Sequence, residues 1–173
     1  MNNFKKKQAS DFEKGKKAED RFAELIPGCR KATKEEDREK HIDLFLSREL
    51  CAKHLKWHLP KGMKEVSFDV KTIKKVNDIP REDAQYLELQ NVEGKLGWIY
   101  GEAYCIVFEQ TDSWIIALNK TVRELAEKHS KGKVASVENK YKFHEPYMRA
   151  TRKDITVLVE TSEIKYVLIV KKK

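Results

Sequence analysis

Residues 66–72 read Val-Ser-Phe-Asp-Val-Lys-Thr, and this short stretch decides the fold that the sequence predicts. Apolar and polar side chains alternate along it, which is typical of a β-strand because neighbouring side chains point to opposite faces. The apolar residues share one face, whereas Ser67, Asp69 and Lys71 share the other. The strand is therefore expected to present a carboxylate and an ammonium side by side, opposite its apolar face.

The preceding strand is predicted at residues 42–46, Ile-Asp-Leu-Phe-Leu, where Asp43 interrupts an apolar run. If the two strands pair, Asp43 and Asp69 converge. Two close carboxylates repel one another, and a divalent cation relieves that repulsion. Carboxylate oxygens together with retained waters suit magnesium. The plain alternatives are an ordinary ion pair between Asp69 and Lys71 on a solvated face, and an Asp43 that caps a backbone group.

A helix is predicted from about residue 11 to residue 26, and Pro27-Gly28 should end it. Its apolar stripe consists of Phe12, Phe22, Ala23 and Ile26. Glu19 lies seven residues from both Phe12 and Ile26, so it falls inside the apolar stripe and not on the solvent-exposed face of the helix. A carboxylate there is expected to face the protein body, where it could hold a metal-bound water or act as a third acidic ligand. The alternative is a side chain that reaches solvent or pairs with Lys16 or Arg21.

Together these residues resemble the PD-(D/E)xK nuclease superfamily, which includes restriction endonucleases, Holliday-junction resolvases and phage nucleases. Asp43 takes the place of the first acid, Asp69-x-Lys71 that of the (D/E)xK element, and Glu19 that of an acid on the first helix. The resemblance covers residues 11–128 at the level of pattern. It implies that Asp43 and Asp69 bind magnesium, with manganese as a substitute, that Lys71 positions the attacking water, and that Glu19 assists.

The resemblance also implies the fold: a three-layer α/β restriction-endonuclease-like core, with a central mixed β-sheet flanked by helices. The backbone carbonyl of Val70 is a further candidate metal ligand. This sequence departs from the family pattern at two positions. Ile42 precedes the first acid where proline is frequent, and the second acid is Asp69 where glutamate is more usual, which shortens the reach to a metal.

Composition bears on partners and compartment. The chain has 173 residues, enough for one compact domain, with 36 Lys and Arg against 28 Asp and Glu and a formal charge of +8. That surplus favours polyanionic partners through counterion release. Three cysteines without regular spacing predict no disulfide framework and fit a reducing cytoplasm. The polar N-terminus is no secretory signal, and apolar runs are only strand-length, so no membrane span is expected.

The remaining elements are predicted from local patterns. The expected organisation is a flexible basic tail at 1–10 followed by a single nuclease-like domain at 11–173. Its predicted connections are a charged loop at 30–40, a long excursion between strands at 47–65, and a loop or short helix at 74–85. Further strands are predicted at 86–91, in a hairpin of 103–109 and 114–118, and at 155–160 and 164–170. A second helix is expected to run from a Thr121–Glu124 capping box to Gly132.

Weaker signals surround the proposed centre. Glu88 and Gln90 share one face of the expected third strand and are candidate auxiliary residues. Cys51, His54 and His58 are spaced like part of a zinc site without an evident fourth ligand. Two basic segments are candidate contacts to a nucleic-acid backbone, with a tryptophan that could stack on a base; their residues are Lys53, Lys56, Trp57, Lys61, Lys64, Lys74, Lys75 and Arg81.

The leading interpretation is therefore a metal-dependent nuclease that hydrolyses DNA phosphodiester bonds, most simply as an endonuclease. A structure-selective Holliday-junction resolvase is the alternative within the enzymes, and a homodimer would suit it. A basic nucleic-acid-binding protein without catalysis is the alternative from another class. All three take DNA as the partner.

Overall fold

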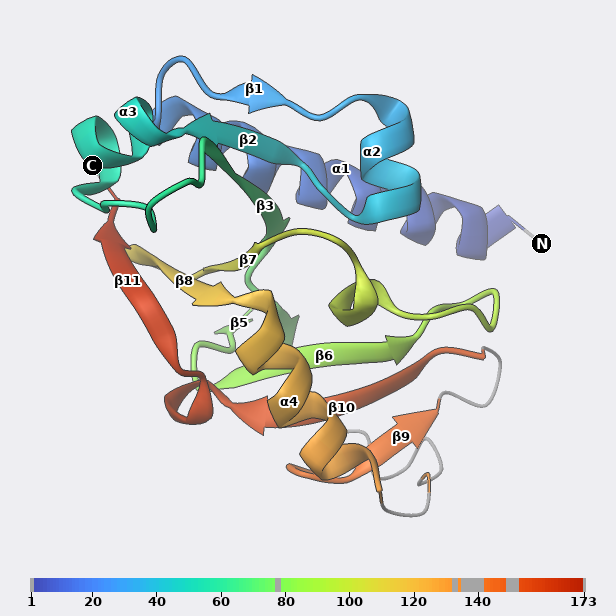
Figure 1. Cartoon of the computed structure of the whole chain (residues 1–173). Helices are drawn as coiled ribbons and strands as arrows, with labels where there is room; N and C mark the ends of the chain where they lie inside the picture. Colours follow the sequence, from blue (N-terminus) through green and yellow to red (C-terminus); the bar gives the residue numbers. More distant parts are fainter. Residues whose placement is uncertain (1, 77–78, 132–133, 135–141, 149–152, 173) are drawn as a thin grey trace. The chain divides into compact units, whose positions relative to one another are not determined.

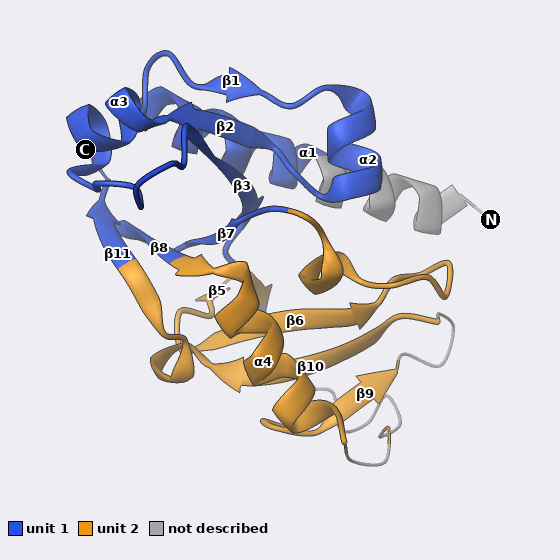
Figure 2. Cartoon of the chain, viewed as in Figure 1, with its two compact units in different colours: residues 1–73, 103–116, 168–173 blue, residues 74–102, 117–167 orange. Residues whose placement is uncertain are grey.

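The computed structural model describes the chain except for residues 1, 77–78, 132–133, 135–141, 149–152 and 173, and except for the side chains of residues 2–12 and 76 (Figure 1). Its contacts divide the chain into two compact units (Figure 2). Unit 1 comprises residues 1–73, 103–116 and 168–173, and unit 2 comprises residues 74–102 and 117–167. Each unit is described by itself.

The largest sheet has six strands in the order β1-β2-β3-β7-β8-β11. These strands are β1 (Arg30–Lys31), β2 (Leu44–Ser47), β3 (Glu65–Lys71), β7 (Cys105–Glu109), β8 (Ser113–Leu118) and β11 (Tyr166–Lys171). β2 is antiparallel to both β1 and β3, whereas β3 runs parallel to β7. The protein is thus an α/β protein with a mixed sheet, as the sequence predicted at this level.

Unit 1 also contains the helical segments that precede or connect these strands. They are α1 (Asn2–Leu25), α2 (Lys34–Lys40), α3 (Arg48–Leu50) and the π-helical turn η1 (Cys51–Leu55). α1 begins at Asn2, ahead of the predicted start at residue 11. Residues 30–40, expected to be loop, contain β1 and α2 instead, and the expected excursion at 47–65 begins with α3 and η1.

The core of unit 1 forms where α1 packs against β3. Ala18, Phe22 and Ile26 follow one another at helical spacing and are fully buried. The ring of Phe22 meets Phe68 of β3 edge-on at 5.7 Å and lies 5.1 Å from Trp114 of β8. These contacts hold the inward face of α1, and with it Glu19, against the sheet.

Unit 2 is built around a second sheet of three antiparallel strands in the order β6-β10-β9. Its elements are β4 (Lys75–Val76), β5 (Ile79–Pro80), β6 (Ala84–Gln90), η2 (Trp98–Tyr100), α4 (Asn119–Ser130), β9 (Pro146–Met148), β10 (Ile155–Glu160) and η4 (Thr161–Glu163). α4 packs against β6, β10 and η2, with Val122 and Ala126 buried.

Several predicted elements are confirmed, and others need correction. The hairpin of β7 and β8 and the two C-terminal strands lie close to the predicted ranges, and the three cysteines are unpaired. The predicted capping box of α4 is wrong: the helix starts at Asn119, and the hydroxyl of Thr121 donates back to the carbonyl of Leu118 at 2.8 Å. Gly132, the expected end of that helix, lies outside the described residues. The strand predicted at 86–91 is β6 (Ala84–Gln90), and it pairs with β10 in the three-stranded sheet.

Candidate active site

The strand β3 presents Asp69 and Lys71 on one face, as its alternation predicts. Their side chains form an ion pair, with 2.5 Å between the Lys71 Nζ and the Asp69 Oδ1. Asp69 is only 2% exposed, because the strand is paired with β2 on one side and with β7 on the other. A carboxylate buried this deeply needs partners for both oxygens. The ammonium of Lys71 serves one of them.

Asp43 comes directly before the first residue of β2. It forms two hydrogen bonds with the backbone of Phe68 and Val70, the residues on either side of Asp69. Its backbone N–H donates to the carbonyl of Phe68 at 2.8 Å, and its Oδ2 accepts from the N–H of Val70 at 2.6 Å. The register of β2 on β3 places Leu44 opposite Phe68. The predicted convergence of Asp43 and Asp69 therefore follows from strand pairing at the point where β2 begins.

The two carboxyls lie in an environment that disfavours their simultaneous ionisation. Burial, and then the charge of Asp69, raises the pKa of Asp43 to about 7. Burial also raises the pKa of Asp69, against the opposing effects of Lys71 and of a hydrogen bond with Asp43. When both are ionised, no donor in the described part of the chain reaches the buried Oδ2 of Asp69. A proton shared between the carboxyls, or a cation, resolves this.

Glu19 on α1 belongs to the same electrostatic group. Its side chain is half-buried, as expected for its place beside the buried stripe. Burial is the largest cause that raises the pKa of Glu19 to about 7, and the charges of Asp43 and Asp37 add to it, whereas Lys71 opposes it. The charge of Glu19 in turn raises the pKa of Asp69. Three carboxyl groups therefore share the neighbourhood of the Lys71 ammonium.

The residues fit a divalent cation by their chemistry. Carboxylate oxygens are hard ligands, and a cation offers Asp69 Oδ2 the partner that it lacks. In a strand, the N–H and the carbonyl of one residue point to the same edge, so the carbonyl of Val70 is directed toward the side where Asp43 lies. Glu19 is not packed as tightly: among the described residues, Glu19, Asp43 and Asp69 do not form a group with all ligand atoms within 4.8 Å of one another. Glu19 is thus better placed to act through a water than as a direct ligand.

His41 is a residue of this neighbourhood that the sequence reasoning missed. It ends α2 with a left-handed φ of 51°, is half-buried, and its backbone N–H donates to the carbonyl of Asp37 at 3.1 Å. Burial and the positive charge of Lys71 lower the pKa of His41, although Asp37 opposes this, so the site favours the neutral imidazole. The available signal was its position two residues before Asp43.

A second buried carboxylate holds the chain directly after Lys71. Glu109 of β7 accepts hydrogen bonds from the hydroxyl of Thr72 at 3.0 Å and the backbone N–H of Ile73 at 3.4 Å. It also forms ion pairs with Arg21 and Lys172. Glu109 is 3% exposed, and these donors lower the pKa of its carboxyl despite its burial. The network fixes the end of β3 and so the backbone that carries Lys71.

The auxiliary candidates Glu88 and Gln90 belong to unit 2, whereas Glu19, Asp43, Asp69 and Lys71 belong to unit 1. Both candidates lie on β6 in the three-stranded sheet of unit 2, where Glu88 is opposite Thr156 of β10. The amide of Gln90 donates to the carbonyl of Lys153 at 2.6 Å. No shared sheet therefore connects them to Asp69. Their auxiliary role stays a prediction.

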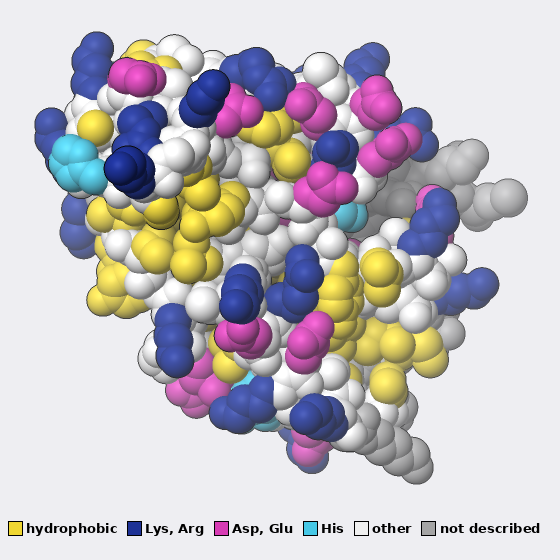
Figure 3. Space-filling view, viewed as in Figure 1, with side chains coloured by type: hydrophobic (Ala, Val, Ile, Leu, Met, Phe, Trp, Pro, Cys, Tyr) yellow, Lys and Arg dark blue, Asp and Glu magenta, His cyan; other side chains and the backbone are white. Residues whose placement is uncertain are grey.

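The candidate nucleic-acid contacts divide between the two units. Lys53, Lys56, Lys61 and Lys64 are exposed in unit 1, together with a half-buried Trp57, whereas Lys74, Lys75 and Arg81 belong to unit 2. Arg81 forms an ion pair with Asp83 at 2.7 Å. On the face that Figure 3 displays, Lys and Arg side chains are interspersed with Asp and Glu. The basic residues thus give a mixed surface there, not one continuous positive patch.

The cysteine and histidine residues do not gather as the sequence suggested. Among the described residues, Cys51, His54 and His58 do not form a group of ligand atoms within 4.8 Å, whereas His129, His144 and Glu163 do.

None of the described helices combines the length and the apolar character needed to span a bilayer. Comparisons of the chain with protein-family models, with curated proteins and with solved structures gave no match.

Proposed function

We propose that Glu19, Asp43, Asp69 and Lys71 form the active site of a magnesium-dependent nuclease that hydrolyses DNA phosphodiester bonds. The observation that carries the proposal is the contact between the carboxyls of Asp43 and Asp69, one of which has a buried oxygen that no donor of the described chain reaches. A protein that needs only stability gains nothing from such a pair. A protein that binds a divalent cation needs it.

The fold is compatible with this proposal. The mixed sheet and the helix α1 on β3 agree with the three-layer restriction-endonuclease-like architecture that the sequence pattern implies. The acids and the lysine come from the elements that the pattern assigns to them: a helix, the start of one strand, and the end of the next. Fold alone carries no function, so the argument rests on the side chains.

Each side chain has a role that its surroundings support. Asp43 and Asp69 would hold the cation, with the carbonyl of Val70 as a further ligand. A bound divalent cation supplies Lewis acidity toward the phosphate and lowers the pKa of a coordinated water. Lys71, held beside Asp69, offsets negative charge that develops on the phosphate. Glu19, whose pKa is raised to about 7, accepts a proton from the attacking water near neutral pH.

DNA is the proposed substrate because of charge. The chain carries 36 Lys and Arg against 28 Asp and Glu. Phosphate contacts from exposed lysines supply most of the affinity of a protein that reads no base sequence. The exposed lysines at 53, 56, 61 and 64 belong to the same unit as the acidic group and are the proposed backbone contacts.

The test is cleavage of supercoiled plasmid, linear duplex and a four-way junction with magnesium, with manganese, or with EDTA. We expect Asp69→Asn and Lys71→Ala each to lose at least about a hundredfold in rate while still binding DNA. Asp112→Asn and Lys120→Ala are matched controls, because both residues are exposed, and should cut like the wild type. Glu19→Gln should slow cleavage, whereas Glu24→Gln on the exposed side of the same helix should not.

The outcomes separate the alternatives. Equal cutting by the wild type and by both active-site variants, or cutting in EDTA, would overturn the proposal. Cutting confined to the four-way junction would favour the resolvase. DNA binding without any cutting in magnesium or manganese would leave a non-catalytic binding protein.

A further inference from the structure

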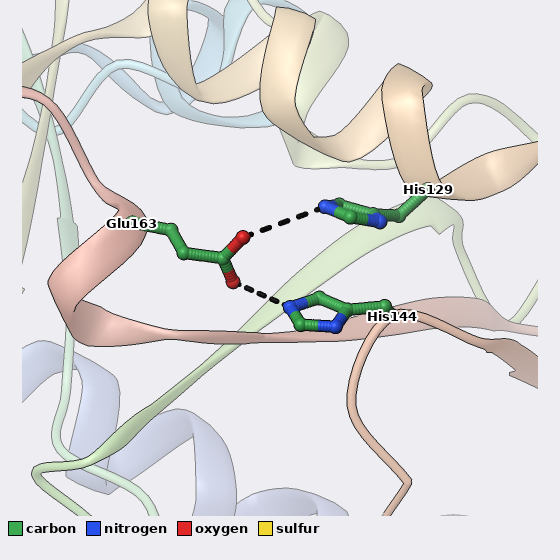
Figure 4. A group of neighbouring side chains, drawn as sticks. All are labelled: His129, His144 and Glu163. Atoms are coloured by element: carbon green, nitrogen blue, oxygen red, sulfur yellow. Dashed lines mark hydrogen bonds and ion pairs between the residues drawn. The ribbon is translucent and has the colours of Figure 1, made fainter.

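A second group of potential ligands lies in unit 2, well separated in sequence from the acids of the proposed active site. It consists of His129, His144 and Glu163, which come from the last turn of α4, the segment before β9, and η4 (Figure 4). One ligand atom from each lies within 4.8 Å of the others. The spacing between these residues matches no short motif, so only the tertiary structure reveals them.

Both imidazoles direct a nitrogen at the same carboxylate. The Nε2 of His144 is 2.6 Å from Oε2 of Glu163, and the Nε2 of His129 is 3.6 Å from Oε1. The second distance is too long for a hydrogen bond, and the Nε2 of His129 is buried without a hydrogen-bond partner in the described structure. The contact is an ion pair if the ring of His129 is protonated, whereas a neutral ring leaves this buried nitrogen in need of a further group.

The geometry of the three donors is close to what a metal ion requires. Donor atoms about 2.0–2.1 Å from a tetrahedral zinc ion lie roughly 3.3 Å from one another. The nitrogen-to-oxygen distances of 2.6 and 3.6 Å lie on either side of that value. With all three ligand atoms within 4.8 Å of one another, their separations are of the order that a shared ion requires.

The backbone holds these donors in place. His144 has a left-handed φ of 66°, and its N–H donates to the carbonyl of Leu158 in β10 at 2.8 Å. Oε2 of Glu163 also accepts from the backbone N–H of Glu160 at 3.1 Å. The rings of His129 and His144 stack at 4.4 Å between centroids, with 25° between their planes. Such positioning lowers the ordering entropy that a ligand set loses on binding.

We propose that His129, His144 and Glu163 form a binding site for a divalent transition-metal ion, with zinc as the representative. Two imidazoles and one carboxylate suit zinc and its neighbours, whereas magnesium prefers oxygen alone. The side chains are 13%, 39% and 26% exposed, so a hydrated ion can enter and keep water in its remaining positions. The site is independent of the proposed nuclease centre.

The direction of the pKa shift of His129 agrees with the proposal, which stands on the geometry above. Burial, the neighbouring His144 and Lys128 lower the pKa of His129, although Glu163 opposes this. A neutral imidazole is the form that binds a metal.

The experiment is a zinc titration of the untagged chain after removal of metals with a chelator, followed by calorimetry. The background variant Asp69→Asn keeps the acidic site from contributing. We expect one equivalent of zinc to bind and magnesium to give no heat at this site. His144→Gln and Glu163→Gln should each weaken binding by at least about tenfold. His58→Ala, an exposed histidine outside the cluster, should bind zinc like the background.

Circular dichroism and the melting temperature of each variant establish that it is folded. Folded His144→Gln and Glu163→Gln variants that retain full zinc affinity would overturn the proposal, as would the absence of a stoichiometric zinc equivalent in the background chain. Loss of the equivalent in His58→Ala would also overturn it and would point to the segment of Cys51. The expected pH dependence is weaker zinc binding as the pH falls through the imidazole range, because protons then compete for the ligands.

Discussion

Replacing Asp43 by asparagine should make the metal-free protein more stable at alkaline pH. The amide keeps an oxygen that accepts from the N–H of Val70, and its NH2 group can donate to Asp69, which lacks a donor for one oxygen. The substitution also removes one of two like charges in a buried place. A residue whose replacement stabilises the protein is a residue retained for function.

The magnitude follows from the pKa of Asp43. Burial and the charge of Asp69 raise the pKa of Asp43 to about 7, against about 3.9 in an unfolded chain. Three pH units at about 1.36 kcal/mol each give an upper bound of about 4 kcal/mol for holding Asp43 ionised. The carboxyl of Asp43 is part-exposed, so solvent screening reduces the expected gain to about 2 kcal/mol.

The free energy of unfolding of the wild type depends on pH through Asp43. Between about pH 4 and about pH 7 the folded wild type binds more protons at Asp43 than the unfolded chain does, so its stability falls as the pH rises through this window. Asp43→Asn lacks that proton uptake. The stability difference between the two proteins should therefore be small near pH 4 and reach its full size above pH 7.

The assay is urea unfolding in EDTA at several pH values, followed by tryptophan fluorescence, for which the buried Trp114 is a natural probe. Asp112→Asn is the control for loss of an exposed carboxylate. Adding magnesium at pH 8 should stabilise the wild type and leave Asp43→Asn unchanged. A wild type that gains stability from pH 5 to pH 8 relative to Asp43→Asn would refute the reasoning.

Three further substitutions test what stabilises the fold of each unit. Glu109→Gln should lower the free energy of unfolding by about 2 kcal/mol, measured by urea denaturation, because the buried side chain loses its charge-assisted hydrogen bonds with the part-exposed Arg21 and Lys172. Gly97→Ala should lower the melting temperature and the free energy of unfolding by about 1–3 kcal/mol or more, because its Cβ would lie 2.1 Å from the carbonyl oxygen of Glu88. Thr33→Ala breaks the capping box with Glu36 at the start of α2 and should cost about 1 kcal/mol in the same assay, whereas Thr33→Ser should cost little.

The part of the site that the sequence predicted depends on local periodicity. Asp69 and Lys71 share a face because residues two apart on a strand always do, and Glu19 lies beside the buried face of α1 because seven residues are close to two helical turns. The position of Asp43 needed one further assumption, that consecutive strands pair. That assumption is right more often than not, and β2 and β3 obey it.

The same assumption failed for β6. Its strand character was readable from residues 86–91, but its partner is β10, whose residues lie far along the chain. Nothing in the pattern of β6 distinguishes a place beside β3 from a place beside β10, because both have one buried face. Glu88 and Gln90 were named as candidates because they share one face of that strand, and this spacing does not specify which strand lies beside it.

Helix α2 was missed for a different reason. Residues 34–40 are charged or polar throughout, so they carry no apolar stripe, and none of them is buried. Its signal was in the cap: Thr33 and Glu36 bond each other's backbone in a capping box, with Glu35, Glu36 and Asp37 in the first turn. Reading that signal would also have drawn attention to His41, which ends the helix near Lys71.

The carboxylates of the proposed site repel one another, and the surrounding donors offset this repulsion only in part. Lys71 pairs with one oxygen of Asp69, and the N–H of Val70 serves one oxygen of Asp43. One ammonium cannot neutralise Asp43, Asp69 and Glu19 together. The raised pKa values of all three carboxyls reflect their burial and the negative charge that is left unbalanced. A bound divalent cation would lower these pKa values, so the binding of metal and the release of protons should be coupled. If magnesium binding at pH 7 releases no protons into a weakly buffered solution, then the carboxyls are not its ligands, and the raised pKa values need another explanation.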